Sequence, residues 1–156
     1  MGVNQVVELD SSWSWAVRYR GEILLILKRF QEALGDFNKS IELKSESDWA
    51  FYYRALAYQA LNQPEQAKMD FDRAIQLAQK TYDEKPTDHQ NTFNLALYHL
   101  AAGSIQQAWQ FYREGLKHGA GENHIREAIR DLEDFLRVFP GHGWATKAKA
   151  ELEKRL

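Results

Sequence analysis

The chain repeats one pattern of small, aromatic and aliphatic residues, and this repeat limits the possible folds more than any other feature. The stretch from Phe30 to Leu43 recurs as Pro64 to Leu77 and again, after a longer interval, as Ile105 to Leu116. A period of roughly 34 residues is typical of proteins built from stacked units. The aligned positions are the alanines Ala33, Ala67 and Ala108, the aromatics Phe37, Phe71 and Tyr112, the small residues Ser40, Ala74 and Gly115, and the aliphatics Ile41, Ile75 and Leu116.

Each copy of this pattern predicts an α-helix with one apolar face. The alanine, aromatic, small and aliphatic positions stand at i, i+4, i+7 and i+8, which lie on the same side of a helix. The small residues let a neighbouring helix come close, and the aromatic residue fills the remaining gap. The polar residues between them are expected to face water, and in the first copy they are Glu32, Asp36, Lys39 and Glu42.

A second helix is predicted upstream of each copy. Twelve residues before the repeated alanines stand the small residues Gly21, Ala55 and Ala96. Ser14 and Asp48 precede the first two of these helices and are favourable N-cap residues. Each unit is therefore predicted to be a pair of antiparallel helices, and the chain an all-α solenoid, an α-α superhelix of stacked helix pairs. The short turns are expected at residues 28–29, 62–64 and 103–104.

The pattern resembles the tetratricopeptide repeat family. That family places a small residue eighth, an alanine twentieth, an aromatic twenty-fourth and an alanine twenty-seventh. All three units follow this pattern, with Ser40, Ala74 and Gly115 at the last position. The proline that the family carries near position 32 is absent, and Ser45, Gln79 and Ala120 stand there. The resemblance covers roughly residues 1–122 and is strongest to a C-terminal piece of a bacterial repeat array. It implies a scaffold that binds proteins or peptides.

The repeats predict one domain over residues 1–156. Val7 to Leu9 match Ile41 to Leu43 one period later, so residues 1–11 are expected to be the remnant of a preceding repeat helix. That remnant is either a degenerate natural cap or the start of a piece cut from a longer array. The expected repeats cover residues 14–47, 48–88 and 89–122, and a divergent capping helix pair covers residues 123–156.

The second repeat is predicted to contain a longer second helix. The spacing to the third repeat grows by seven residues, which is close to two helical turns, so the helix can continue through Tyr82 without rotating its faces. It is expected to end before Glu84, because the residue ahead of Pro86 resists helical geometry. This extension is either an element that a partner touches or a tolerated insertion.

The last segment is predicted to form two helices. Apolar residues recur at helical spacing from Ile125 to Phe139, and residues 140–143 (PGHG) break the pattern. In the final helix Trp144, Ala148 and Leu152 share one side, which suits a helix that covers the end of a stack.

Composition excludes several classes of function. The net charge of −2 gives no basic excess for nucleic acid, and the chain contains no cysteine. No apolar run approaches the length of a membrane span and no signal peptide is visible, so a cytoplasmic location is expected. No catalytic motif appears, and we expect no enzyme activity, cofactor or metal; His118 and His124 flank a glycine turn but lack further ligands at suitable spacing.

The family resemblance implies a concave binding surface on the first helix of each unit. Aromatic residues with polar tips are frequent there, as in binding hot spots. Trp15 and Trp49 fit either this surface or the core, and of the adjacent Tyr52 and Tyr53 at most one is expected to point into the core. The predicted surface consists of Trp15, Arg18, Tyr19, Glu22, Trp49, Tyr52, Tyr53, Leu56, Gln59, Phe93, Asn94 and Leu97.

Chaperone C-terminal tails are not expected as partners. Family members that bind such tails hold the terminal carboxylate with basic residues and asparagines. Of the corresponding residues here, Arg18 fits and Glu22 repels a carboxylate. The sequence thus predicts a module that binds a protein or peptide of unknown identity. The alternative is a structural or sensor segment of a longer array in a bacterial regulator, with self-association possible through an uncapped N-terminal end.

Overall fold

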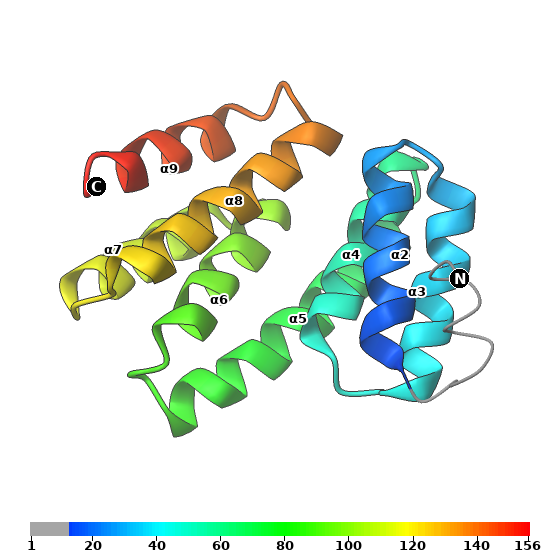
Figure 1. Cartoon of the computed structure of the whole chain (residues 1–156), viewed down its shortest axis with the longest axis horizontal. Coiled ribbons are helices and arrows are strands. Elements are labelled where there is room, and N and C mark those ends of the chain that lie inside the picture. The colour runs from blue at the N-terminus through cyan, green and yellow to red at the C-terminus, as the bar shows by residue number, and fades with distance from the viewer. Residues whose placement is uncertain (1–12) are drawn as a thin grey trace. The chain divides into compact units, whose positions relative to one another are not determined.

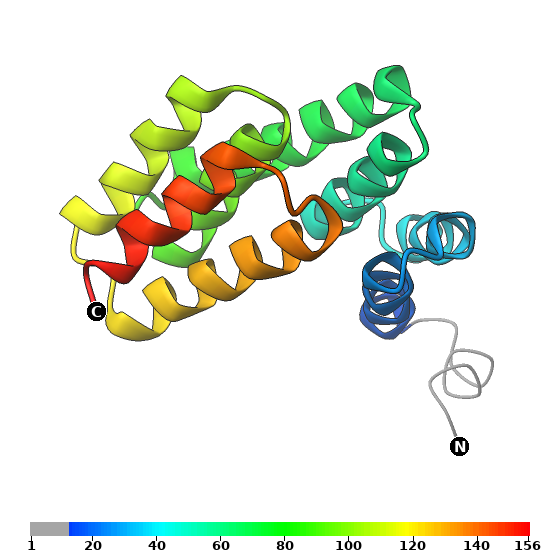
Figure 2. The same cartoon turned by 90° about the horizontal axis from the view of Figure 1, so that it is seen from above.

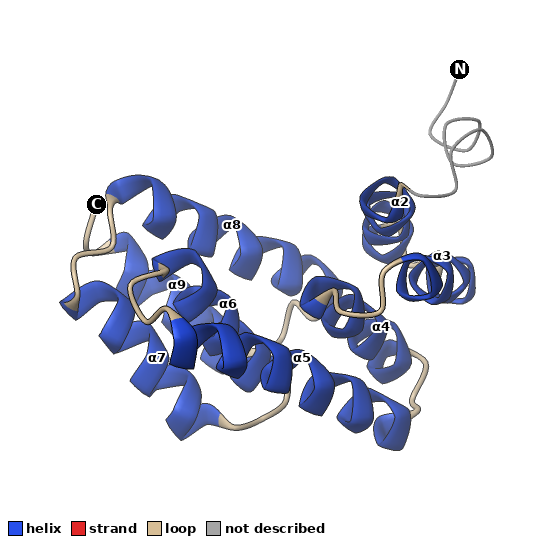
Figure 3. Ribbon diagram, turned by 90° about the horizontal axis from the view of Figure 1, so that it is seen from below, coloured by secondary structure: helices blue, strands red, loops and turns tan. Residues whose placement is uncertain are grey.

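The computed structural model describes residues 13–156, and in this range it contains α-helices and no strands (Figures 1 and 3). The prediction of an all-α fold is confirmed. The expected helix remnant at residues 1–11 lies outside the described residues. Contacts divide the described residues into two compact units, which meet in sequence between residues 74 and 75. The helices are α2 (Ser14–Ile26), α3 (Phe30–Leu43), α4 (Asp48–Ala60), α5 (Pro64–Glu84), α6 (His89–Ala101), α7 (Ile105–Lys117), α8 (Glu122–Val138) and α9 (Gly143–Glu153).

In the first unit α2 packs against α3, and α3 packs against α4. The repeated small and aromatic positions make these contacts, as the sequence pattern predicts. Ala33, Phe37 and Ser40 are fully buried. At Gly21 an added Cβ would lie 2.6 Å from Cε1 of Phe37, so α2 and α3 are closer here than an alanine permits.

In the second unit α6 pairs with α7 and α8 pairs with α9, while α6 also contacts α8 and α7 contacts α9 (Figures 1 and 2). Gly115 of α7 repeats the close approach of the first unit, since a Cβ there would lie 2.5 Å from Cε1 of Phe93 on α6. On α8 the residues at helical spacing form a buried stripe that includes Ile125, Leu132 and Phe135. From α9, Ala148 and Leu152 enter the core.

The long helix α5 passes through Thr81 and Tyr82 and ends at Glu84, one residue further than the proline argument places it. Only Lys85, directly before Pro86, falls outside the helix. The extension packs on α7: the Tyr82 ring meets Phe111 edge-on at 5.2 Å, and the Tyr82 hydroxyl donates a hydrogen bond to Glu114. This hydrogen bond raises the pKa of Tyr82 to about 12.

Two ion pairs recur at the period of the repeat. Arg20 on α2 donates two hydrogen bonds to Asp36 on α3, at 2.7 and 2.5 Å. Arg54 on α4 donates two to Asp70 on α5, both at 2.7 Å. The expectation that Asp36 faces water is wrong, because the carboxylate is buried against its arginine. Each pair connects the two helices of one repeat.

The helix caps differ from the expected ones by one residue. Trp13 is the N-cap of α2, and Ser47 caps α4 by accepting a hydrogen bond from the amide of Ala50 at 3.4 Å. Ser14 is instead a buried contact, since its hydroxyl donates to the carbonyl of Ser40 at 2.9 Å. A serine can satisfy its hydroxyl between helices as well as at a helix end, and spacing along the chain does not separate the two.

The turns inside the repeats share one backbone geometry. Lys28, Asn62 and Gly103 all have positive φ, at 63°, 60° and 88°. A single left-handed residue at this point ends the first helix of each pair and allows the second to return beside it. None of the helices within residues 13–156 combines the length and apolar character that a bilayer span requires.

Candidate functional site

A stripe of large apolar residues lies exposed along α2, in the first unit. Trp15, Tyr19 and Ile23 are spaced four residues apart and are therefore on one side of the helix. Their side chains are 61%, 55% and 41% exposed. Trp13 extends the stripe, with its indole stacked on Trp15 at 5.9 Å. We call Trp15, Tyr19 and Ile23 the α2 stripe.

An ion pair lies on the same helix. Arg18 donates a hydrogen bond to Glu22 at 2.8 Å, one turn along α2. Both side chains are partly exposed. Two of the predicted binding residues thus neutralise one another, and the α2 stripe carries an apolar surface with a balanced pair of charges on its helix.

The predicted binding residues fall into three groups by exposure. Trp15, Tyr19 and Gln59 are exposed, and Arg18, Glu22 and Trp49 are intermediate. The others lie in the interior. Phe93, for example, fills the space beside Gly115 within the second unit. The buried residues are Tyr52, Tyr53, Leu56, Phe93, Asn94 and Leu97.

Tyr52 and Tyr53 correct the expectation that at most one of them enters the core. Both are buried, and their rings meet edge-on at 5.0 Å. Tyr53 stacks on Phe37 of α3 at 5.9 Å, while Tyr52 lies near Phe71 of α5. Adjacent helical residues point about 100° apart, and α4 has a helix of the same unit on each of these sides. Both tyrosines can therefore be core residues.

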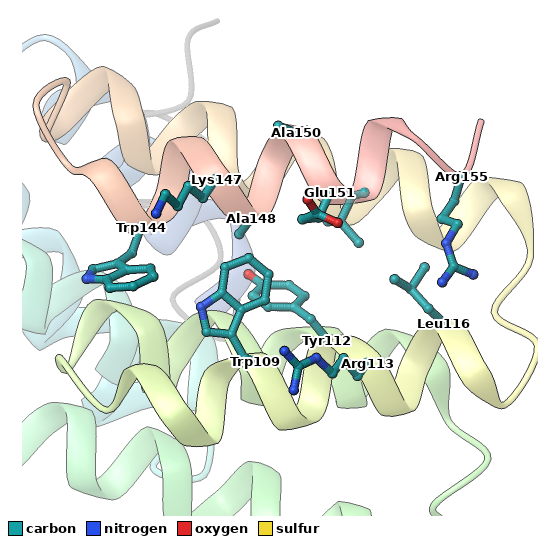
Figure 4. A pocket seen from close by; sticks show the side chains of 11 residues that line it. Trp109, Tyr112, Arg113, Leu116, Trp144, Lys147, Ala148, Ala150, Glu151 and Arg155 are labelled. Carbon is teal, nitrogen blue, oxygen red and sulfur yellow. The ribbon is translucent and has the colours of Figure 1, made fainter.

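The second unit contains a groove between α7 and α9, with a volume of about 920 Å³ (Figure 4). Trp109 and Trp144 stand at one end, with their rings edge to face at 6.5 Å. Leu116 and Arg155 lie at the other end. We call this site the α7–α9 groove, and it is lined by Trp109, Tyr112, Arg113, Leu116, Trp144, Lys147, Ala148, Ala150, Glu151, Leu152 and Arg155.

The rim of the α7–α9 groove is basic. Arg113, Lys147 and Arg155 are exposed cations, and none has an ion-pair partner among residues 13–156. The one carboxylate of the lining, Glu151, accepts a hydrogen bond from Lys154 at 2.8 Å. This bond, together with the charges of the neighbouring arginines, lowers the pKa of Glu151.

Two polar atoms in the second unit are buried without hydrogen-bond partners in the described part of the chain. They are the hydroxyl of Tyr112 and Nδ1 of His99. Tyr112 stands where the first two repeats have Phe37 and Phe71, so its hydroxyl enters a site shaped for phenylalanine. Burial raises the pKa of Tyr112 and lowers that of His99, because both charged forms lose water.

The α2 stripe and the α7–α9 groove both place apolar side chains beside charged ones. Within residues 13–156, no three histidine, cysteine or acidic side chains gather in a way that could hold a metal ion. Of the histidines flanking the glycine turn, His124 has its ring near His89 at 6.0 Å. Large apolar surface beside fixed charges is the chemistry of molecular recognition.

Sequence reasoning missed the ion pairs and the α7–α9 groove. The pairs had a visible signal: Arg20 and Arg54, like Asp36 and Asp70, are separated by one repeat period. A charged pair that recurs at the repeat period marks a contact between helices. The groove had a weaker signal, namely Trp109 and Trp144 with cations nearby on two separate helices.

Comparison with known proteins identifies the repeat. The family profile described as tetratricopeptide repeat matches residues 50–81, which covers most of α4 and most of α5. This match confirms the family resemblance read from the repeated positions. In a comparison with curated proteins, no sequence matches the chain.

Solved structures of helical-repeat proteins are similar to this chain. A structure from the functional characterization of Pseudomonas aeruginosa PilF has 18% identity over 97% of this chain and 65% of that chain, with a TM-score of 0.50. MamA has 18% identity over 74% of this chain and 64% of its own, with a TM-score of 0.47. YrrB, described as a TPR protein with an unusual peptide-binding site, has 15% identity over 96% and 98%, with a TM-score of 0.45.

The PilF similarity bears on the fold alone. At this level of identity, the PilF match establishes the helical-repeat architecture, and the predicted solenoid class is confirmed. The chain spans about two thirds of the PilF and MamA chains, 65% and 64%.

Proposed function

We propose that this chain, an array of tetratricopeptide repeats, is a protein-interaction module and that the α2 stripe contacts its partner. The observation that carries the proposal is the exposure of Trp15, Tyr19 and Ile23 on one side of α2. Exposing three large apolar side chains on one side of a helix to water is unfavourable in free energy. Fully burying each would contribute about 1.5–3 kcal/mol, enough to support micromolar binding after ordering costs.

Of the predicted binding residues, the exposed ones on α2 in the first unit are the better candidates for contact with a partner. Trp15 and Tyr19 are members of the predicted set that a partner can reach, with Arg18 and Glu22 beside them on α2. Tyr52, Tyr53 and Phe93 are poor candidates for contact because their side chains hold the core. Aromatic residues with a polar tip, such as Trp15 and Tyr19, combine large apolar area with hydrogen-bonding capacity.

The same stripe supports a second candidate function, the stacking of another helix pair. In the next repeat of the first unit, the residue equivalent to Tyr19 is Tyr53, and its ring packs on Phe37 of α3. A helix like α3, from a longer array or from a second copy, would cover the α2 stripe in the same way. The module would then be a structural segment whose partner is another repeat.

A peptide-display selection tests the first candidate. The chain would be used to select binding peptides, and the affinity of each peptide would be measured for the wild type and for Trp15→Ala/Tyr19→Ala. We expect the double variant to bind at least about tenfold more weakly, because two anchors are lost. Met69→Ala is the matched control, since Met69 is a 73% exposed apolar residue outside the stripe.

Sedimentation of the free chain separates the two candidates. A dimer that Trp15→Ala/Tyr19→Ala dissociates would favour stacking over peptide binding. If the selected peptides bound the double variant as tightly as the wild type, the α2 stripe would not be the contact surface, and the proposal would be abandoned.

A further inference from the structure

We infer that the α7–α9 groove is a second docking site, which receives an acidic amphipathic helix from a protein partner. This site lies entirely in the second unit and is built from the second helices of two neighbouring pairs. It is separate from the α2 stripe in residues and in chemistry. The inference therefore does not depend on the proposed function of α2.

The groove offers an apolar floor and walls. Tyr112, Ala148 and Leu152 form buried parts of the lining, while Trp109 and Leu116 are partly exposed. Figure 4 shows the Trp109 and Trp144 indoles together at one end, where they fill the space between α7 and α9. Further along, Ala148 and Leu152 of α9 line the groove opposite Tyr112 and Leu116 of α7. The volume of about 920 Å³ is larger than one aromatic side chain can fill.

The cations that line the α7–α9 groove favour a partner of negative charge. The whole chain has a net charge of −2, yet the groove is lined by three cations and one carboxylate. That carboxylate, Glu151, is already bound by Lys154. A neighbouring hollow of about 640 Å³ continues past Arg113 and Arg155 and adds Lys117 to the basic side, with Glu114 held by Tyr82. A partner with carboxylates on its flanks is attracted here, and a basic partner is repelled.

The spacing of the groove residues suits a helix. Trp109 and Leu116 are seven residues apart on α7, a rise of about 10 Å or two helical turns. A third helix laid between two others packs its side chains into their grooves at ordinary interhelical distances. Its apolar residues at i, i+3, i+4 and i+7 would meet the floor.

The cations lie at both ends of this contact. Lys147 is near Trp144, with its amino group 4.8 Å from the centre of the indole ring. Arg155 follows eight residues later, at the opposite end of the groove. Carboxylates about two turns apart on the partner helix would therefore reach Lys147 at one end and Arg155 at the other, with Arg113 between them (Figure 4).

Binding of a synthetic peptide to the full chain tests the inference. The probe is a fluorescein-labelled peptide of about 18 residues, long enough to form a helix, with leucines on one face and glutamates on its flanks. Fluorescence anisotropy would compare the wild type with Arg113→Glu/Arg155→Glu. We expect binding to weaken at least about tenfold, because two attractions become repulsions.

A matched variant controls for the change in net charge. Lys80→Glu/Lys85→Glu alters the charge of the second unit by the same amount at two exposed lysines outside the groove. Its affinity for the peptide should stay within about twofold of the wild type. The same peptide with lysines in place of glutamates should bind at least about tenfold more weakly. Circular dichroism confirms that each variant folds.

Nuclear magnetic resonance locates the bound peptide. The indole N–H signals of Trp109 and Trp144 should shift on addition of the acidic peptide, while the signal of Trp15 stays unchanged. Three results would overturn the inference. The first is that Arg113→Glu/Arg155→Glu binds the acidic peptide as tightly as Lys80→Glu/Lys85→Glu does, and the second is that the lysine peptide binds the wild type as tightly as the glutamate peptide does. The third is that the peptide shifts the indole signal of Trp15 in place of those of Trp109 and Trp144. A peptide-free dimer that Arg113→Glu/Arg155→Glu dissociates would also overturn it, because a second copy would then be the occupant.

Discussion

The helices α2 and α4 are equivalent members of successive repeats, yet the side that carries the first tryptophan and tyrosine is exposed on α2 and covered on α4. Trp15 and Trp49, and likewise Tyr19 and Tyr53, occupy the same position in successive repeats. Tyr19 is 55% exposed and Tyr53 is 8% exposed. The cause is the neighbouring helix pair: α3 packs against α4, and Phe37 covers Tyr53, whereas no earlier pair is present in residues 13–156. A residue's place in a repeat thus fixes its direction, and the neighbouring repeat determines whether it is buried.

The largest expected difference between the two helices is in stability. Tyr53→Ala should lower the free energy of unfolding by about 3–5 kcal/mol, since it removes a buried ring and leaves a cavity. Tyr19→Ala should change it by about 0.5 kcal/mol or less, as at other surface sites. Urea denaturation followed by circular dichroism measures both. Equal losses for the two variants would mean that Tyr19 is also packed in solution.

The ion pairs Arg20–Asp36 and Arg54–Asp70 should instead contribute similar amounts to the free energy of unfolding. Asp36→Asn and Asp70→Asn each weaken a two-bond contact and should cost about 2 kcal/mol, because hydrogen bonds to charged groups are worth about 1.5–3 kcal/mol. Arg20 and Arg54 keep access to water, which holds the loss below that of a fully buried pair. Double-mutant cycles with Arg20→Gln and Arg54→Gln would isolate the coupling within each pair. A coupling found in one repeat and absent from the other would contradict the equivalence.

A smaller effect is expected at the helix crossing in the first repeat. Gly21→Ala should cost about 1–2 kcal/mol, because a Cβ there would lie 2.6 Å from the buried Phe37 ring. This overpacking exceeds the gain of about 1 kcal/mol that alanine brings to a helix. The second repeat already has Ala55 at this position, so Ala55→Gly serves as the reverse control and should also destabilise. Thermal unfolding would detect both changes, and a more stable Gly21→Ala variant would refute the close approach.

The smallest effect concerns the third repeat. Tyr112→Phe should raise the free energy of unfolding by up to about 1 kcal/mol, because it removes a buried hydroxyl that has no partner in the described residues and restores the residue type of the other two repeats. Tyr82→Phe is the matched control and should destabilise, since the Tyr82 hydroxyl donates to Glu114. Chemical denaturation measures both variants. A loss of stability in Tyr112→Phe would show that its hydroxyl is hydrogen-bonded in solution.

Much of the fold could be predicted from the repeat. The spacing of Ala33, Phe37 and Ser40 indicates which face of a helix is buried, and Gly21 indicates where two helices approach. Exposure could not be predicted in the same way, because it depends on contacts between neighbouring repeats. The interior positions of Tyr52 and Phe93 follow from α4 and α6 having neighbours on more than one side, which a single repeat pattern does not encode.

The candidate sites were less predictable than the fold. The family resemblance indicated Trp15 and Tyr19 as residues on the first helix of a repeat, and both side chains are exposed on α2. The α7–α9 groove depends on where α9 lies beside α7, and α9 belongs to a segment that departs from the repeat pattern. A surface formed by two helices from different pairs has no signature within either helix.

The Arg20–Asp36 pair has a consequence for how α2 meets a partner. This contact connects α2 to α3 within their own repeat, and Gly21 fits closely over Phe37 beside it. These two contacts hold α2 against α3 within the repeat. A partner that binds the exposed face of α2 finds a rigid, prearranged template, so little conformational entropy is lost in ordering the receiving side.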